Sequence, residues 1–138
     1  MIITLTRDIA TCRQVRRIVF IEEQGVSEAD EVDDLDDDAL HLLARVDGQP
    51  AGTARLLVMG DKVKVGRVCV LATQRGTGLG VALMRAAIDQ ARSLPGISRV
   101  RLGAQTYALG FYERLGFAAQ GPEFDDAGIP HREMVLTL

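Results

Sequence analysis

The sequence contains few residues of the types that mark disulfide-stabilised, metal-binding or nucleic-acid-binding proteins. Tryptophan is absent, and there are only four Phe, two Tyr and two Cys among 138 residues. Neither Cys12 nor Cys69 has a CxxC partner, so we expect reduced, buried thiols without a disulfide or a bound metal. A net charge of −3 and the lack of a basic, aromatic strand surface argue against nucleic acid as a partner.

Long hydrophobic runs are also missing from the sequence. No stretch approaches the roughly 18 apolar residues of a membrane span. The N-terminal residues, "MIITLTRDIATCRQVRR", lack the basic-then-apolar order of a secretory signal. We therefore expect no membrane partner and a cytoplasmic location. With 47% hydrophobic residues, the chain can bury a core without cross-links, and we expect a single domain over residues 1–138.

Negative charge is concentrated in one segment. Residues 28–38, "EADEVDDLDDD", hold eight of the 19 acids and no base, which leaves 11 acids against 16 bases elsewhere. An anion site on the remainder is therefore plausible on electrostatic grounds, and the acidic segment could attract a cation. The alternative is that this segment is only a solvated loop.

Hydrophobic periodicity and turn residues predict an α/β (α+β) chain with the order β-α-β-β-β-α-β-α-β. A helix ending at Gly25 follows the first strand, and the acidic segment forms a loop or irregular helical turns. Three consecutive strands joined by tight turns precede the second helix. The expected strands are 1–6, 39–46, 51–59, 62–71, 99–105 and 131–138, and the expected helices are 12–24, 79–93 and 108–116.

Three glycines lie between an expected strand and helix, in "VLATQRGTGLGVALMRAAIDQAR", residues 70–92. The free N–H groups of a helix's first turn bind anions, and glycine lets the backbone approach a phosphate closely. A P-loop would need a lysine after a glycine, and a dinucleotide site would need GxGxxG early in a parallel βαβ unit, so both fit poorly. Glycines that merely ease a tight turn remain an alternative.

The loop is similar to the pyrophosphate loop of the GNAT superfamily of acyl-CoA-dependent N-acyltransferases, whose signature is [Q/R]-x-x-G-x-[G/A]. A later stretch, "AQTYALGFYERLGF", resembles the family's second motif at Ala108, Phe111, Tyr112, Gly116 and Phe117, with Gln105 where asparagine is usual. The stretches "VFIEEQ", "DEVDDLDDDALHLL" and "GIPHREM" resemble the ElaA-like branch of small bacterial members.

This resemblance implies a fold and a cofactor site. The fold would be a mixed, mostly antiparallel sheet of about six to seven strands flanked by helices. Strands four and five would splay apart near Gly66 or Gly103. Acetyl-CoA would be the co-substrate, with no metal. Its pantetheine arm would lie along the strand edge, and Gln105 would bond a pantetheine amide. The expected contacts are Val68, Cys69 and Val70 on that strand, and Arg75, Gly76, Thr77, Gly78, Leu79 and Gly80 around the pyrophosphate.

The resemblance also assigns a general acid and leaves the base open. Tyr112 occupies the family's tyrosine position and would protonate the leaving thiolate, unless it only packs between Phe111 and Phe117. Strand four offers no carboxylate or histidine as a base. The remaining candidates for a catalytic or acceptor-side role are Glu23, Asp33, His41 and His131, with His131 favoured because Ile129 and Pro130 would fix its loop. Either histidine could instead be structural.

Two further residues near the expected site have alternative roles. Arg67 is expected to shape the acceptor site by pairing with the acidic segment, for example with Asp33, although a plain salt bridge is equally open. Cys69 could act as an acyl-carrying nucleophile, but it has no obvious histidine partner and suits a core position better.

The function implied is direct acetyl transfer to a primary amine of a small molecule or peptide, with the acidic segment favouring cationic acceptors. One alternative is an enzyme like the acyl-homoserine-lactone synthases, whose "VF" and "ARLL" stretches are echoed here. Another is a CoA-binding sensor or interaction module without turnover. The oligomeric state is open, with a homodimer as one option.

Overall fold

The computed structural model describes all residues from 1 to 138 and centres on a seven-stranded sheet in the order β1-β2-β3-β4-β5-β7-β6. Only β4 and β5 pair in parallel, and every other pairing is antiparallel. The strands are β1 (Ile2–Thr6), β2 (Leu40–Val46), β3 (Gln49–Met59), β4 (Lys62–Val70), β5 (Arg99–Gln105), β6 (Ala118–Asp126) and β7 (Ile129–Thr137).

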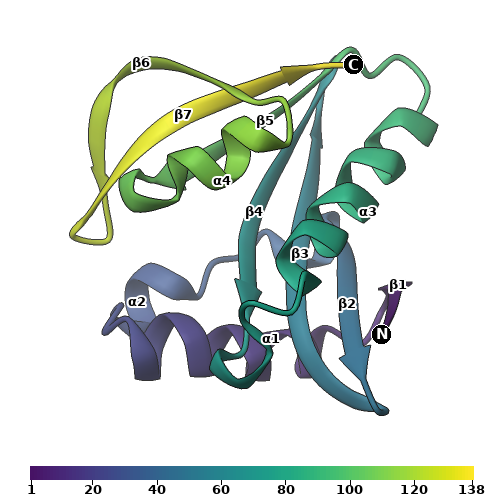
Figure 1. The fold of residues 1–138 in the computed structure, drawn as a ribbon, viewed down its shortest axis with the longest axis vertical. Helices are drawn as coiled ribbons and strands as arrows, with labels where there is room; N and C mark the ends of the chain where they lie inside the picture. The colour runs from purple at the N-terminus through teal and green to yellow at the C-terminus, as the bar shows by residue number, and fades with distance from the viewer.

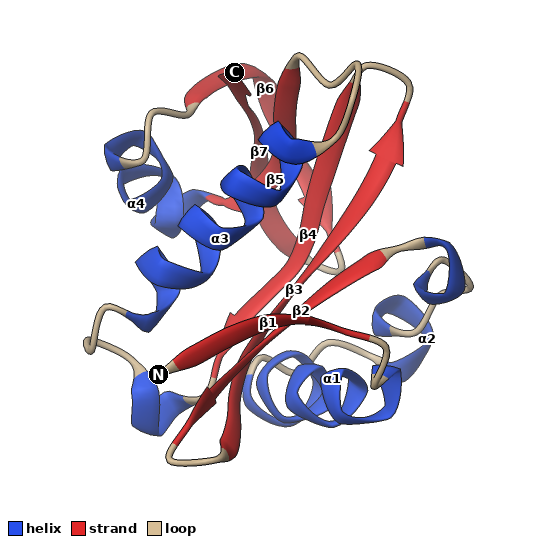
Figure 2. Ribbon diagram, turned by 90° about the vertical axis from the view of Figure 1, so that its right-hand side faces the viewer, coloured by secondary structure: helices blue, strands red, loops and turns tan.

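Helices cover both faces of this sheet. Helices α3 (Leu79–Ser93) and α4 (Leu109–Arg114) lie on one face, and α1 (Ile9–Arg16) and α2 (Glu28–Glu31) lie on the other (Figures 1 and 2). The larger core forms under α3, where Leu83, Met84 and Ala87 pack fully buried against the strands. Such spacing places one face of a helix against the sheet. None of the helices combines the length and the apolar character needed to cross a bilayer.

Strands β4 and β5 separate after a short parallel contact. They pair only from Lys62 to Lys64 on β4 and from Arg99 to Arg101 on β5. Figure 1 shows the two strands close together near the C-terminus and spread apart toward α1. The predicted splay between the fourth and fifth strands is therefore confirmed. It leaves a wedge with unpaired strand edges on both sides.

A β-bulge lies on β4 at the start of this wedge. The pairing with β3 shifts by one residue between Gly66 and Cys69, and Arg67 adopts a φ of 52°. A non-glycine residue in this left-handed region costs about 1–2 kcal/mol. The extra residue also reverses the alternation of side chains. Val63 and Val65 face the core under α3, whereas Cys69 faces α1, with Val15 and Val19.

Two elements differ from those expected from the sequence. The predicted helix 12–24 begins earlier, at Ile9, and continues beyond Arg16 as a π-helix, η1 (Arg17–Glu23). Strand β6 is not among the predicted strands, because Gly121, Pro122 and three acids interrupt any alternating pattern. It is an edge strand, where proline and a bulge are tolerated.

A buried ion-pair network connects α1, the acidic segment and the sheet. Asp36 accepts two hydrogen bonds from Arg16, at 2.9 and 2.6 Å, one from Arg13 at 2.9 Å and one from Arg55 at 3.2 Å. Burial alone would raise the pKa of the Asp36 carboxyl, but the hydrogen bonds from Arg16 and Arg13 hold it well below its usual range. The side chains of Arg16 and Asp36 are each 4% exposed. The acidic segment is thus partly a structural element.

We predict that Asp36→Asn lowers the free energy of unfolding at pH 7 by about 3–5 kcal/mol, because it leaves buried arginines without their partner. Asp37→Asn should change it by less than about 0.5 kcal/mol, since Asp37 is exposed and makes no ion pair. Urea denaturation of both variants and wild type measures the difference. Equal stability of the two variants would contradict the role of the network.

The same carboxylate predicts a pH dependence. A carboxylate whose pKa is lower in the folded state stabilises the protein above its unfolded pKa of about 3.9. That stabilisation disappears as the pH falls toward the folded value. The free energy of unfolding of the wild type should therefore drop between about pH 5 and pH 2, and that of Asp36→Asn should drop less. Parallel pH profiles for the two proteins would exclude Asp36 as the source.

Candidate active site

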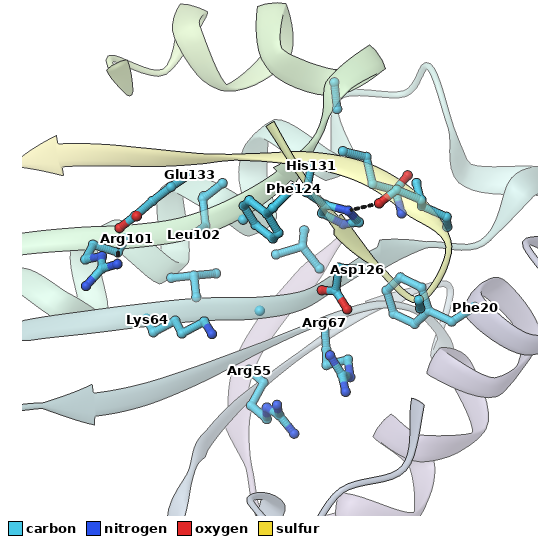
Figure 3. A pocket seen from close by; sticks show the side chains of 18 of the residues that line it. Phe20, Arg55, Lys64, Arg67, Arg101, Leu102, Phe124, Asp126, His131 and Glu133 are labelled. Carbon is cyan, nitrogen blue, oxygen red and sulfur yellow. Dashed lines mark hydrogen bonds and ion pairs between the residues drawn. The ribbon is translucent and has the colours of Figure 1, made fainter. Parts of the chain in front are cut away.

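A cavity of about 410 Å³ opens where β4 and β5 separate. Its walls come from β3, β4 and β5, from the hairpin of β6 and β7, from η1 and from the segment that begins α4. Figure 3 shows charged side chains on β3 and β4 facing His131, Phe124 and Asp126 of the β6–β7 hairpin. The cavity is of the size that small-molecule ligands occupy.

The glycine-rich loop presents unpaired backbone donors. Gly76 and Gly78 have φ values of 75° and 86°, and an added Cβ at either would have no neighbour within 4 Å. The N–H groups of Gly76, Thr77 and Gly78 have no acceptor in the protein, and the first helical bond runs from Ala82 N–H to the Gly78 carbonyl. The N–H groups of the first turn of α3 extend this row. The loop can therefore hold an anion.

The strand edge beside this loop is available for a further hydrogen-bonded chain. Leu71 N–H donates to Ala51 on β3, at 2.8 Å. Polar groups on a strand alternate in direction, so those of Val70 face the wedge. The Val70 carbonyl accepts a hydrogen bond from Arg75 Nε at 3.1 Å, and the same guanidinium forms an ion pair with Glu23. Arg75 thus connects the loop to the end of β4 and to η1.

Tyr112 combines a partly buried ring with a hydroxyl that forms no hydrogen bond. Its ring packs edge-on against Phe111 and Phe117, with centroids 5.0 and 6.0 Å apart. The residue lines the cavity, and its Oη has no hydrogen-bond partner in the protein. Burial raises the pKa of Tyr112 to about 12. The ring of Tyr112 therefore packs against its neighbours while its hydroxyl remains available as a proton donor.

His131 lies on β7, paired in register with Gln105 of β5. Its Nδ1 donates to the Ile129 carbonyl at 2.7 Å, and its ring stacks on Phe124 with centroids 5.8 Å apart. A proton fixed on Nδ1 leaves Nε2 of the neutral ring as an acceptor. His131 also lines the cavity. The ring is thus oriented and keeps one nitrogen available to a ligand.

Other expected site residues fall into two groups. Gln105, Val68 and Arg67 line the cavity, and Gln105 Nε2 donates to Gln24 Oε1 at 3.1 Å. The expected pairing of Arg67 with Asp33 is present, at 3.3 Å. Three residues expected on the acceptor side are absent from the cavity wall: Glu23, which pairs with Arg75; Asp33, which pairs with Arg55 and Arg67; and His41, which donates to the Asp36 carbonyl. Of the expected cofactor contacts, Cys69, Val70 and residues 75–80 also lie outside the cavity wall.

Cys69 is a core residue in this structure. It is 5% exposed, and burial raises the pKa of its thiol to about 11. Its Sγ lies 3.4 Å from Thr53 Oγ1. A thiol that stays protonated at neutral pH is a poor nucleophile, so the geometry does not support an acyl-carrying role.

Three cavity residues are not among the site residues expected from the sequence. Phe20 and Gln24 come from η1 and its end, and Asp126 ends β6. A helix with regular α-periodicity would direct Phe20 and Gln24 differently, and β6 itself was not expected. A π-helix often accompanies a functional site, but sequence patterns do not reveal one.

The comparisons with known proteins match this geometry. A family model described as an acetyltransferase (GNAT) domain covers residues 14–138. The chain belongs to the GNAT family of acetyltransferases. It is 39% identical over 132 residues to the uncharacterized Bacillus subtilis protein YyaT, covering 94% of this chain and 88% of that one. It is 33% identical to the crystal structure of an acyl-CoA N-acyltransferase from Pseudomonas aeruginosa, with a TM-score of 0.88 and 98% of both chains covered.

More distant structures share the fold. Escherichia coli ElaA is 24% identical, with a TM-score of 0.84 and 99% of each chain covered. A Bacillus subtilis acetyltransferase solved in complex with CoA is 19% identical, with a TM-score of 0.75 and coverage of 99% of this chain and 97% of that chain. The predicted family and fold class are confirmed, and this GNAT protein is an acyltransferase by family.

We predict that a carboxylate at position 78 expels acetyl-CoA from the glycine loop. Gly78→Asp should weaken acetyl-CoA binding at least tenfold more than Gly78→Asn, because the two side chains have the same shape and differ in charge next to the phosphates. Asp and Asn both tolerate positive φ and cap helices, so both variants should fold. Calorimetric titration measures the two affinities.

The salt dependence provides the control for this comparison. The difference in acetyl-CoA affinity between Gly78→Asp and Gly78→Asn should become smaller at high ionic strength, where charges more than a few ångströms apart are screened. Equal affinities of the Asp and Asn variants at low salt would place the pyrophosphate elsewhere.

Proposed function

We propose that this GNAT protein transfers the acetyl group of acetyl-CoA directly to a primary amine of a small molecule or peptide. The observation that carries this proposal is the wedge between β4 and β5. The free end of β4 leads into the glycine loop with its unpaired N–H groups, and the cavity in the wedge has Tyr112 and His131 on its walls. Tyr112 Oη and His131 Nε2 each lack a hydrogen-bond partner there. The hydroxyl can donate a proton and the imidazole nitrogen can accept one, which supports the proposal.

The residues at the wedge fit acetyl-CoA, which would supply an activated acetyl group and depart as a thiol. Residues 75–80 would hold the pyrophosphate through backbone N–H groups and the Arg75 guanidinium. The free edge of β4 near Val68 and Val70 would bind the pantetheine arm as an added strand. A backbone N–H near Val70 would stabilise negative charge on the carbonyl oxygen, a type of contact worth roughly 2.7–4 kcal/mol in other enzymes.

Tyr112 would act as the general acid. Its pKa, raised to about 12, keeps the hydroxyl protonated throughout the neutral range, whereas a thiolate near pKa 8.5 accepts a proton there. Because the protonated form is the active one, activity through Tyr112 disappears only as the pH rises toward 12. No alkaline loss assignable to this group is expected below about pH 10.

His131 would act as the general base through Nε2. A pH of 7 is about 3.4 units below the pKa of a lysine-like amine. Deprotonating the ammonium to the free amine that reacts therefore costs about 4.6 kcal/mol. A proton acceptor beside the amine lowers that cost. The hydrogen bond from Nδ1 to the Ile129 carbonyl fixes the tautomer that can accept a proton at Nε2.

We expect Tyr112→Phe to reduce kcat by about 100-fold or more while the Kd for acetyl-CoA changes little. Tyr107→Phe is the matched control, because it removes the same hydroxyl from a ring that is 79% exposed. Steady-state kinetics at saturating acetyl-CoA, with pre-steady-state traces to show that chemistry limits the rate, measure the effect. An unchanged kcat in Tyr112→Phe would restrict Tyr112 to packing.

The release of free thiol from acetyl-CoA in the presence of mixed primary amines tests the proposed function as a whole. A sensor or interaction module without turnover would bind acetyl-CoA and release no thiol. We expect thiol release by the wild type and its loss in His131→Gln, which keeps a polar side chain but cannot accept a proton at neutral pH. Tight acetyl-CoA binding without thiol release from any amine would favour the sensor.

A further inference from the structure

The charges of the cavity wall differ from those of the acidic segment. Four of the eight acids in residues 28–38 form ion pairs: Glu28, Glu31, Asp33 and Asp36. The buried network joins four guanidiniums, from Arg13, Arg16, Arg55 and Arg67, to three carboxylates, from Glu31, Asp33 and Asp36. The network therefore carries one excess positive charge, and the segment offers fewer free carboxylates to an acceptor than its composition indicates.

Three members of this network line the cavity: Arg55, Arg67 and Glu31. The side chain of Arg55 is 6% exposed and that of Arg67 is 24% exposed. The Nε–H of Arg55 has no hydrogen-bond acceptor in the protein, whereas Arg67 Nε forms an ion pair with Glu31 Oε1 at 3.5 Å. Buried donors without an acceptor are uncommon in folded proteins and call for an explanation. The two arginine side chains rise from β3 and β4 on the same wall (Figure 3).

Lys64 adds an unpaired cation to this wall. It lines the cavity and forms no ion pair, and in Figure 3 it reaches from β4 toward the open space. Arg101, its partner in the parallel register, is instead neutralised by Glu133. Lys62, at the start of β4, is likewise unpaired and lines the cavity. The β3–β4 wall, defined here by Arg55, Lys64 and Arg67, therefore presents three cations. Arg55 pairs with Asp33 and Asp36, and Arg67 pairs with Glu31 and Asp33, so Lys64 is the cation of this wall without a carboxylate partner.

The opposite wall is negative. Asp126 ends β6 and lines the cavity, and it makes no ion pair; Figure 3 draws its carboxylate between the His131 ring and Arg67. Asp30 is a second unpaired carboxylate on the lining, but it lies on α2, beside Glu31, and not on the β6–β7 hairpin. Two opposed walls of opposite charge favour a ligand that carries both signs.

We infer that the acceptor is an amine that also carries an anionic group, a carboxylate or a phosphate. The anion lies against Lys64 and Arg67, and the ammonium lies against Asp126, within reach of His131. This inference rests on the proposed function. The sequence alone favours purely cationic acceptors attracted by the acidic segment; the cavity instead favours an acceptor that bears both charges.

The register sets the separation of the two groups. Lys64 lies level with Arg101, and His131 lies level with Gln105, four residues farther along β5. At about 3.3 Å per residue this is about 13 Å between backbones, which the two side chains shorten from both ends. An amine joined to its anionic group by a chain of several carbons therefore fits better than an α-amino acid reacting at its α-amine.

Matched acceptors test the inference. Thiol release from acetyl-CoA is measured with ε-aminocaproate, with its primary amide and with hexylamine, which share the chain and differ in the anion. Aminohexyl phosphate and aminohexanol form a second pair that distinguishes phosphate from carboxylate. We expect kcat/KM for at least one anionic acceptor to exceed that for its uncharged partner by about tenfold or more at low salt.

Variants of Lys64 locate the recognition. Lys64→Gln should raise KM for the anionic acceptor about tenfold, leave the uncharged partner unaffected and leave acetyl-CoA affinity unchanged. Lys64→Glu should reverse the ranking in favour of hexanediamine. Arg7→Gln is the control, because it removes an exposed cation outside the cavity.

The outcomes separate the two proposals. No thiol release with any of these amines, despite acetyl-CoA binding, contradicts the proposed function. Thiol release with equal or higher kcat/KM for the uncharged acceptors, or equal effects of Lys64→Gln on both members of a pair, overturns the acceptor inference and leaves the acetyltransferase intact.

Discussion

The separation of β4 from β5 beyond Lys64 is the constraint on which the site depends. A continued parallel ladder would satisfy the backbone of both strands and leave nowhere for a ligand to bind. Because the ladder stops, the polar groups of Val70 face the wedge, and the cavity opens between His131 and the β4 bulge. The splay thus costs hydrogen bonds in the free protein, which a bound extended chain can replace.

The bulge and the ion-pair network depend on each other. Arg67 takes up a strained backbone conformation, and its side chain donates to the Glu31 carbonyl at 2.9 Å and to Asp33 at 3.3 Å. These contacts tie the strained residue to the acidic segment, which is itself anchored to α1 through Asp36. A buried network of this kind gives specificity of position more than net stability. Arg55, Arg67 and Glu31 of this network line the cavity, so one set of contacts both shapes the site and contributes charges to it.

The sequence is sufficient to predict the order of most elements, the glycine loop and the family, because these rest on local patterns. Thr77 and its neighbouring glycines lie at a strand-to-helix junction, as their spacing indicates. The predicted pairing of Arg67 with Asp33 is also present, but nothing local shows that Asp33 and His41 point away from the cavity. Asp126 depends on β6, a strand without alternation. Such placements are set by long-range packing, which a single sequence does not display.

The π-helix η1 has a consequence for how this cavity can change. An α-helix advances by roughly 100° per residue, so one residue more or less turns everything beyond it to another face. Phe20 and Gln24 face the cavity from within and just after η1. A π-helix contains more residues per turn than an α-helix. Deleting one residue between Arg17 and Phe20 would therefore let the segment wind as an ordinary α-helix and leave Phe20 and Gln24 close to their present face. Rewinding η1 as an α-helix without the deletion would instead turn both side chains away from the cavity wall.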